Sequence, residues 1–175
     1  SSRPKVGIFN PIFISDKIYI HLLSSDEQIP DLDSEKALVI FHEFLCTIPS
    51  YWVEEKYAGA ATSYYLYVEL DCSVKKIINP MEISKLLTQM MQQYQPEGKF
   101  EFINPESKTY KASIHSLVIL ELKIESIRSK FKVGQNRSVE TRNKILDHLR
   151  TRNSKKKKKA IEEVLKHMKS TDNTG

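Results

Sequence analysis

The chain is poor in the residues on which most catalytic and cofactor motifs depend. It contains two cysteines, five glycines and one tryptophan in 175 residues. With so few glycines and no G-x-G-x-x-G, a dinucleotide-binding α/β fold is effectively excluded. Neither H-x-x-x-H nor C-x-x-C occurs, so the sequence does not favour a metal site. No G-x-S-x-G elbow is present and no base accompanies Cys46 or any serine, so nucleophilic catalysis is not indicated.

Long hydrophobic runs are also missing. The longest apolar stretches, such as residues 37–41, are far too short to cross a membrane, and no charged-then-apolar leader precedes the first expected strand. Cys46 and Cys72 each lie in a strand-like pattern, which is typical of reduced, buried thiols. These features predict a cytoplasmic protein without membrane contact.

Positive charge is concentrated near the C-terminus. The net charge is +5, but residues 142–169 alone carry +8, so the rest of the chain is slightly acidic. We expect one domain over residues 1–150 and a basic, helical or disordered tail over 151–175. Lys155 to Lys159 would suit non-specific contact with nucleic-acid phosphates, and the alternative is a solvated helix end. No helix-turn-helix pattern accompanies the tail.

The hydrophobic pattern predicts six or seven short strands and one internal helix. A hairpin is expected over 6–22, and strands over 37–44, 62–70, 73–78 and 113–127. Asn79 should cap a helix that has Pro80 at its first position and runs to about Tyr94. Its buried side should hold Ile83, Leu86, Leu87, Met90 and Met91. This order favours a mainly β, antiparallel barrel over a doubly wound sheet.

A polar elbow, Lys132 to Arg137, joins the last expected strand to a second helix. Ser138 should cap that helix, Glu140 lies in its first turn, and Ile145 and Leu149 form an apolar pair. Side chains and free N–H groups at such a junction suit an anionic ligand. The alternative is an ordinary left-handed turn at the elbow's glycine, with solvated neighbours.

Four segments in order resemble the PaiB-like proteins, FMN-binding split-barrel proteins described as negative transcriptional regulators. Residues 130–137 resemble the K-x-K-L-S-Q-N-R signature, with Gly134 in place of serine. Residues 10–13 and 18–22 resemble the family's first strand pair, residues 47–52 resemble I-S-P-S-W-Y, and residues 62–64 fall at T-W-N-Y. The resemblance spans about residues 6–150 and implies an antiparallel split barrel, bound FMN and a homodimer.

The resemblance also implies which residues would hold the flavin. A flavin needs a flat apolar wall, hydroxyls and cations for its phosphate, and amides for the ring edge. The wall would be Tyr51, Trp52 and Tyr64; the phosphate contacts Ser50, Lys56, Thr62, Ser63, Lys132 and Arg137; the ring edge Gln135 and Asn136; and His21 would line the pocket. The alternative is that the aromatics serve the core or a dimer interface while the hydroxyls face water.

The chain departs from the family where A-R-A-N is usual. Residues 23–26 read Leu-Ser-Ser-Asp, so Ser24 replaces an arginine, and the family's N-terminal helix and first strand are not seen. The lost arginine would remove a bidentate phosphate partner. Two further functions therefore stay open: a cofactor-free dimeric module acting through its basic tail, and a flavin-dependent oxidoreductase.

Two further expectations concern single residues. His42 and His115 lie in expected strands without partners at metal-ligand spacing, which indicates structural roles. Tyr64, Tyr65 and Tyr67 exceed what one face of a small strand buries internally, which favours a homodimer.

Overall fold

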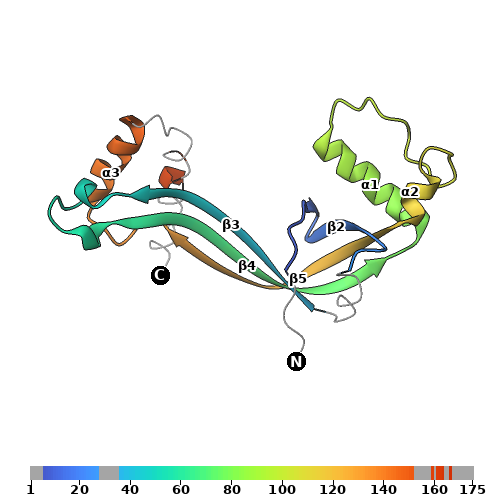
Figure 1. The fold of residues 1–175 in the computed structure, drawn as a ribbon, viewed down its shortest axis with the longest axis horizontal. Helices are drawn as coiled ribbons and strands as arrows, with labels where there is room; N and C mark the ends of the chain where they lie inside the picture. The colour runs from blue at the N-terminus through green and yellow to red at the C-terminus, as the bar shows by residue number, and fades with distance from the viewer. Residues whose placement is uncertain (1–5, 28–35, 152–158, 160, 164–165, 167–175) are drawn as a thin grey trace. The chain divides into compact units, whose positions relative to one another are not determined.

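The computed structural model describes residues 6–27, 36–151, 159, 161–163 and 166. Within them, five strands form one antiparallel sheet in the order β1-β2-β5-β4-β3 (Figure 1). The strands are β1 (Ile12–Ile14), β2 (Lys17–Leu23), β3 (Lys36–Ile48), β4 (Thr62–Ile77) and β5 (Leu117–Lys132). The helices are α1 (Pro80–Tyr94), α2 (Lys111–His115) and α3 (Val139–Thr151). This is the mainly β, antiparallel, split-barrel-like class that the sequence predicts.

The strand number differs from the expected six or seven. The stretches expected as strands 62–70 and 73–78 form one continuous strand, β4. The strand expected over 113–127 begins instead with the short helix α2, and β5 then runs on to Lys132. His115 therefore lies in a helix, where its Nδ1 is 2.8 Å from the carbonyl oxygen of Lys111.

The first hairpin is shorter than expected. Its strands pair in the register Ile12↔Tyr19 to Ile14↔Lys17, with a two-residue turn in which Ser15 has a positive φ of 56°. Residues 6–11 are not part of a strand. Pro11 has no N–H to donate, which explains why pairing begins only after it.

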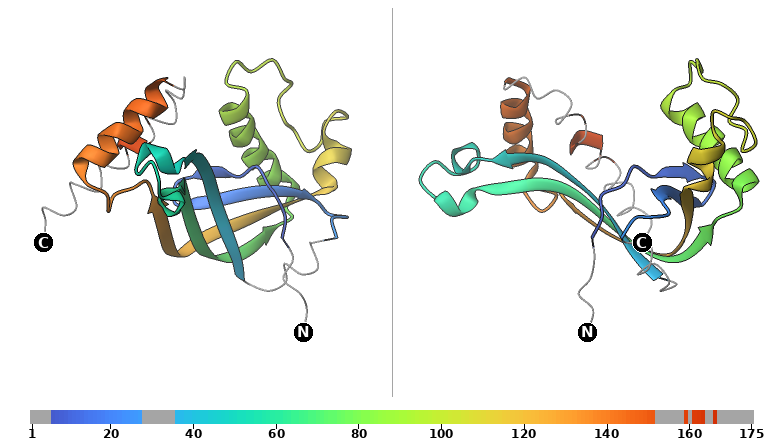
Figure 2. Two further views of the ribbon diagram at one scale, coloured as in Figure 1. Left: turned by 60° about the vertical axis from the view of Figure 1, so that its left-hand side comes forward. Right: turned by 45° about the vertical axis from the view of Figure 1, so that its right-hand side comes forward.

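The chain divides into two compact units. The first unit comprises Ser1–Val39 and Leu70–Ile127, and the second comprises Ile40–Glu69 and Arg128–Gly175. Strands β3, β4 and β5 contribute residues to both (Figure 2). Cys46 and Cys72 are both buried, as expected, and neither forms a disulfide with a described residue. None of the helices in the described part of the chain has the length and hydrophobicity needed to span a bilayer.

In the first unit, α1 packs on the sheet as predicted. Asn79 caps the helix, because its Oδ1 accepts hydrogen bonds from the N–H groups of Met81 and Glu82 at 3.0 and 3.1 Å. Ile83, Leu86 and Met90 are buried in the cluster beneath, and Leu87 and Met91 are partly buried against it.

A charged group lies at the margin of this cluster. The Tyr19 hydroxyl donates to Glu121 at 2.9 Å, and Lys17 lies 3.0 Å from the same carboxylate. Burial, reinforced by the hydrogen bond to Glu121, raises the pKa of Tyr19 to about 12. Burial alone would raise the pKa of Glu121, but Lys17 and Tyr19 together hold it below its ordinary value.

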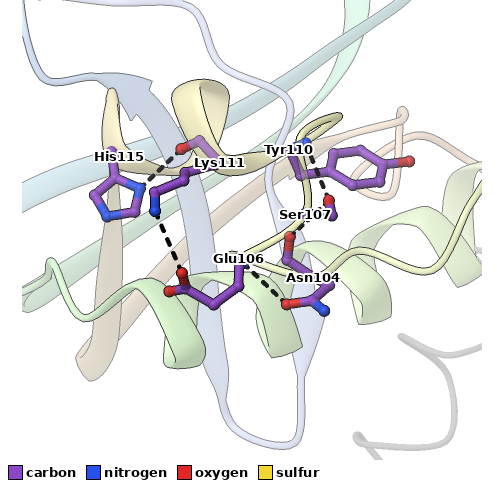
Figure 3. A network of polar contacts seen from close by, with 6 residues as sticks. All are labelled: Asn104, Glu106, Ser107, Tyr110, Lys111 and His115. Carbon is purple, nitrogen blue, oxygen red and sulfur yellow. Dashed lines mark hydrogen bonds and ion pairs between the residues drawn. The ribbon is translucent and has the colours of Figure 1, made fainter.

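A polar network explains why the chain turns into α2 before β5. Ser107 donates to the carbonyl of Asn104, while its hydroxyl accepts from the N–H of Tyr110 at 3.2 Å (Figure 3). Lys111 lies 3.4 Å from the Glu106 carboxylate. These short-range contacts satisfy backbone groups at the helix start, so a helical turn is favoured over an extended strand.

In the second unit, α3 packs on one side of the strands. Ser138 accepts from the N–H of Thr141 at 3.2 Å, which confirms the predicted cap. Ile145 and Leu149 are 1% and 2% exposed, in a cluster that also holds Leu45 and Ile48. Ile161 belongs to the same cluster. Lys155 to Lys158 lie outside the described residues, and Lys159 is exposed.

Candidate functional site

The elbow between β5 and α3 is a tight turn that its own side chains stabilise. Gly134 has a φ of +75°, and the N–H of Arg137 donates to its carbonyl at 3.0 Å. The Gln135 side chain folds back, accepting from the N–H of Val133 at 3.1 Å and donating to the carbonyl of Phe131 at 2.8 Å. The left-handed turn, which the sequence left open as the alternative to a ligand-binding elbow, is therefore present, and the Gln135 amide is engaged with the backbone.

The turn presses against the aromatic ring of Tyr64. A Cβ at Gly134 would lie 1.9 Å from the Tyr64 hydroxyl oxygen, far inside van der Waals contact. Tyr64 is 1% exposed, and its hydroxyl makes no hydrogen bond of good geometry within the described residues. Burial raises the pKa of Tyr64, while the nearby Arg137 guanidinium opposes that rise.

Arg137 connects the elbow to the loop before β4. Its guanidinium donates to the carbonyl of Ala60 at 3.2 Å, two residues before Thr62. The side chain is half-buried. The elbow and the start of β4, which are far apart in sequence, are therefore joined in one place.

The loop between β3 and β4 carries two aromatics with different exposure. Trp52 is 3% exposed and stacks on His148 of α3, with ring centroids 4.8 Å apart and an interplanar angle of 11°. Tyr51 is 53% exposed and meets Trp52 edge-on at 6.4 Å. Trp52 and Tyr64 thus pack in the core of this unit, whereas Tyr51 presents a ring to solvent.

Several polar side chains around this loop are not engaged by the protein. Ser50, Thr62 and Ser63 are half-buried, and their hydroxyls make no hydrogen bond within the described part of the chain. Lys56 and Lys132 are exposed and form no ion pair with any described residue. Asn136 is exposed.

The second unit holds eleven of the twelve residues expected at the site. The exception is His21, which is exposed on β2 of the first unit, opposite Ile119. His42, which was expected to be structural, is exposed on β3 with its ring 5.9 Å from that of Tyr65. No group of His, Cys, Asp and Glu side chains in the described residues could hold a metal ion.

Residues 11–126, about two thirds of the sequence, match the family model described as "Putative FMN-binding domain". The chain belongs to this FMN-binding family. The match includes the loop from Ser50 to Tyr64 and ends before the elbow. A search of curated protein sequences found no match.

Solved structures show the same fold at low identity. The flavocytochrome Anf3 from Azotobacter vinelandii is 15% identical, with a TM-score of 0.59; the alignment covers 74% of this chain and 56% of that one. The FAD and heme binding protein from Mycobacterium smegmatis is 11% identical, with a TM-score of 0.55, covering 71% and 57%. The aligned part of this chain thus spans just over half the length of these proteins.

The residues present fit the phosphate end of FMN better than its ring. The unengaged hydroxyls of Ser50, Thr62 and Ser63 and the exposed ammonium groups of Lys56 and Lys132 are the kinds of donor that an anion needs. Among the three expected wall aromatics, Tyr51 alone is exposed, because Trp52 and Tyr64 are buried. Of the two expected amides, Asn136 is not engaged in a hydrogen bond with the described residues.

Sequence reasoning missed His148 and the contact between Gly134 and Tyr64. His148 lies on α3, close in sequence to the buried Leu149, so the helical pattern could have placed it beside the core. No sequence feature near His148 indicates that Trp52 is its partner. The sequence shows a glycine at position 134, but only the tertiary structure shows why a side chain does not fit there: the ring of Tyr64 lies against the turn.

Proposed function

We propose that this chain binds FMN and acts as a PaiB-type regulator. The observation that carries the proposal is the family match over residues 11–126. Two structural neighbours, a flavocytochrome and a FAD and heme binding protein, agree with a flavin-binding use of this fold. The unengaged hydroxyls and lysines of the second unit support a site for the phosphate.

The phosphate would meet Lys56, Lys132 and Arg137. A phosphate dianion needs charge-assisted partners, and Ser24 stands where the resemblance leads one to expect an arginine. Thr62, Ser63 and Ser50 would add hydroxyl donors, and Tyr51 would offer its exposed ring to the flavin. His21 stays a proposed pocket residue.

The visible absorption spectrum of the purified protein after incubation with FMN and gel filtration tests the proposal. Co-elution of flavin with the protein is expected. Substituting Lys56, Lys132 and Arg137 together by Met should abolish binding while leaving the far-ultraviolet circular dichroism unchanged. Unchanged binding in that triple variant would overturn the phosphate assignment.

A homodimer is also part of the proposal, but it no longer depends on the three tyrosines of β4. Tyr64 is buried in its own unit and needs no partner. The extended segment before β1 instead leaves Val6 and Ile8 89% and 98% exposed. A second copy would remove this apolar surface from water. Light scattering should give twice the 20.3 kDa chain mass, and a value near 20.3 kDa would contradict the dimer.

Two alternatives remain as second candidates. A flavin-dependent oxidoreductase would need the same cofactor, and steady reduction of bound FMN by a nicotinamide donor would favour it. A cofactor-free module acting through Lys155 to Lys159 would show no flavin spectrum and would bind nucleic acid through its tail. We also propose a cytoplasmic location, since the two buried cysteines are not joined in a disulfide.

A further inference from the structure

The three strands of the second unit have one covered face and one open face. Tyr64 and Leu66 of β4, Val133 after β5 and Leu45 of β3 all pack in the cluster under α3. Figures 1 and 2 show α3 on this side of the strands. Because side chains alternate along a strand, the residues between them point to the opposite side.

We define the open face by nine residues, three from each strand. They are Ile40, His42 and Phe44 of β3; Tyr65, Tyr67 and Glu69 of β4; and Arg128, Lys130 and Lys132 of β5.

Contacts between the strands confirm that these residues share a face. The rings of His42 and Tyr65 lie 5.9 Å apart. The Tyr67 hydroxyl donates to Glu69 at 2.5 Å, and Arg128 Nε donates to the same carboxylate at 2.7 Å.

The open face is exposed along β3 and β5 and half-buried along β4, and each strand contributes its own kind of side chain. Ile40 and Phe44 are 51% and 53% exposed, and the Arg128 side chain is 58% exposed, whereas Tyr65 and Tyr67 are half-buried. Rings occupy two adjacent strands, and the third strand presents three cations in a row. Glu69 is the single acid among the nine residues, and it is already bonded to Tyr67 and Arg128.

We propose that the open face binds single-stranded nucleic acid. Aromatic rings on a flat sheet offer stacking surfaces for unpaired bases, and a parallel row of cations follows the phosphates. The described residues of the second unit carry a net charge of +2, against −1 for those of the first, and residues 128–151 alone carry +5, so the positive charge lies on the stretch that begins with the three cations of β5. The proposal does not require flavin binding, and Lys132 is the one residue that belongs to both proposed sites.

A second copy of this chain fits the open face less well. In a two-fold dimer, the open face of one copy would meet the open face of the other. The three cations of each copy would then share one interface, and Glu69 is the only acid that this face of each copy would contribute. Phosphates would neutralise those cations, which is why we commit to the polyanion.

Fluorescence anisotropy of a labelled oligothymidylate of about 12 nucleotides, titrated with the full chain, tests the proposal. Saturable binding is expected. Replacing Tyr65 and Tyr67 together by Ala should weaken it about tenfold or more, whereas Phe at both positions should retain it, because every aromatic face can stack on a base. Replacing Arg128 and Lys130 by Gln should reduce the salt slope by about 1.4.

Lys144→Gln is the matched charge control. Lys144 is 60% exposed on α3, where it pairs with Glu140, and its loss should leave the affinity nearly unchanged. Lys132 is left unaltered, so that the variants do not touch the proposed flavin site.

Four results would overturn the proposal: absence of saturable binding, equal affinity for wild type and the double Ala variant, tighter binding of a duplex of the same length, or a wild-type dimer that the double Ala variant converts to a monomer. The last result would assign the face to a second copy.

Discussion

The two units of this chain are stabilised in different ways, and they differ in what a ligand could use. The first unit, with net charge −2, binds its polar groups to one another, as in the Tyr19–Glu121–Lys17 group and the loop before α2. The second unit, with net charge +7, also pairs Tyr67, Glu69 and Arg128, but it leaves the half-buried hydroxyls of Ser50, Thr62 and Ser63 without a hydrogen bond among the described residues. Half-buried polar groups without protein partners are suited to a ligand. The difference therefore points to the second unit as the binding part.

The largest expected effect comes from filling the space at Gly134. Gly134→Ala would place a Cβ 1.9 Å from the Tyr64 oxygen and would strain a residue at φ +75°, so we expect a loss of about 3 kcal/mol in the free energy of unfolding. Gly98→Ala is the control: its φ is +70°, but nothing lies within 4 Å. It should cost only about 1 kcal/mol from backbone strain. Equal losses in urea unfolding would contradict the packing argument.

The next effect tests whether the C-terminal residues belong to the core of the second unit. Ile161 is 1% exposed and packs in the same cluster as Ile145 and Leu149, so Ile161→Ala should cost about 3 kcal/mol. Lys159→Ala, at an exposed position nearby, should change stability by less than about 0.5 kcal/mol. Thermal unfolding followed by circular dichroism measures both. Indistinguishable melting temperatures would show that Ile161 does not contribute to the core.

A smaller effect is expected in the first unit. Asn79→Ala removes the acceptor for two N–H groups at the start of α1, which should cost about 1 kcal/mol. Asn79→Ser would keep an acceptor and should recover most of that loss. FMN binding should be unaffected by either change if the second unit carries the site. A parallel loss of flavin affinity would remove the distinction between the units.

The sequence predicted what depends on neighbouring residues and missed what depends on distant ones. The cap at Asn79 and the start of α3 at Ser138 each follow from a few adjacent residues, and both are confirmed. The left-handed turn at Gly134, which the sequence left open as an alternative, is also local and is present. The helix α2 is the exception: it was missed although its start depends on local contacts, those of Ser107 with Asn104 and Tyr110.

The same distinction applies to the candidate site. The sequence grouped Trp52 and Tyr64 with the exposed Tyr51, since all three are aromatic and near one loop. Their burial is decided by α3 and the elbow, which are about seventy or more residues away in sequence. An aromatic side chain has the same local pattern whether it packs in a core or presents a wall to a ligand.

The central claim is that this chain binds FMN and that the cations of the second unit contact its phosphate. Titrating the full chain with FMN and with riboflavin tests this claim most directly. Quenching of flavin fluorescence measures both affinities under the same conditions. Riboflavin lacks the phosphate, so we expect saturable FMN binding and an affinity for riboflavin weaker by about tenfold or more, the loss of one or more charge-assisted hydrogen bonds. Equal affinities would contradict the phosphate assignment, and no binding of either flavin by folded protein would contradict the account as a whole.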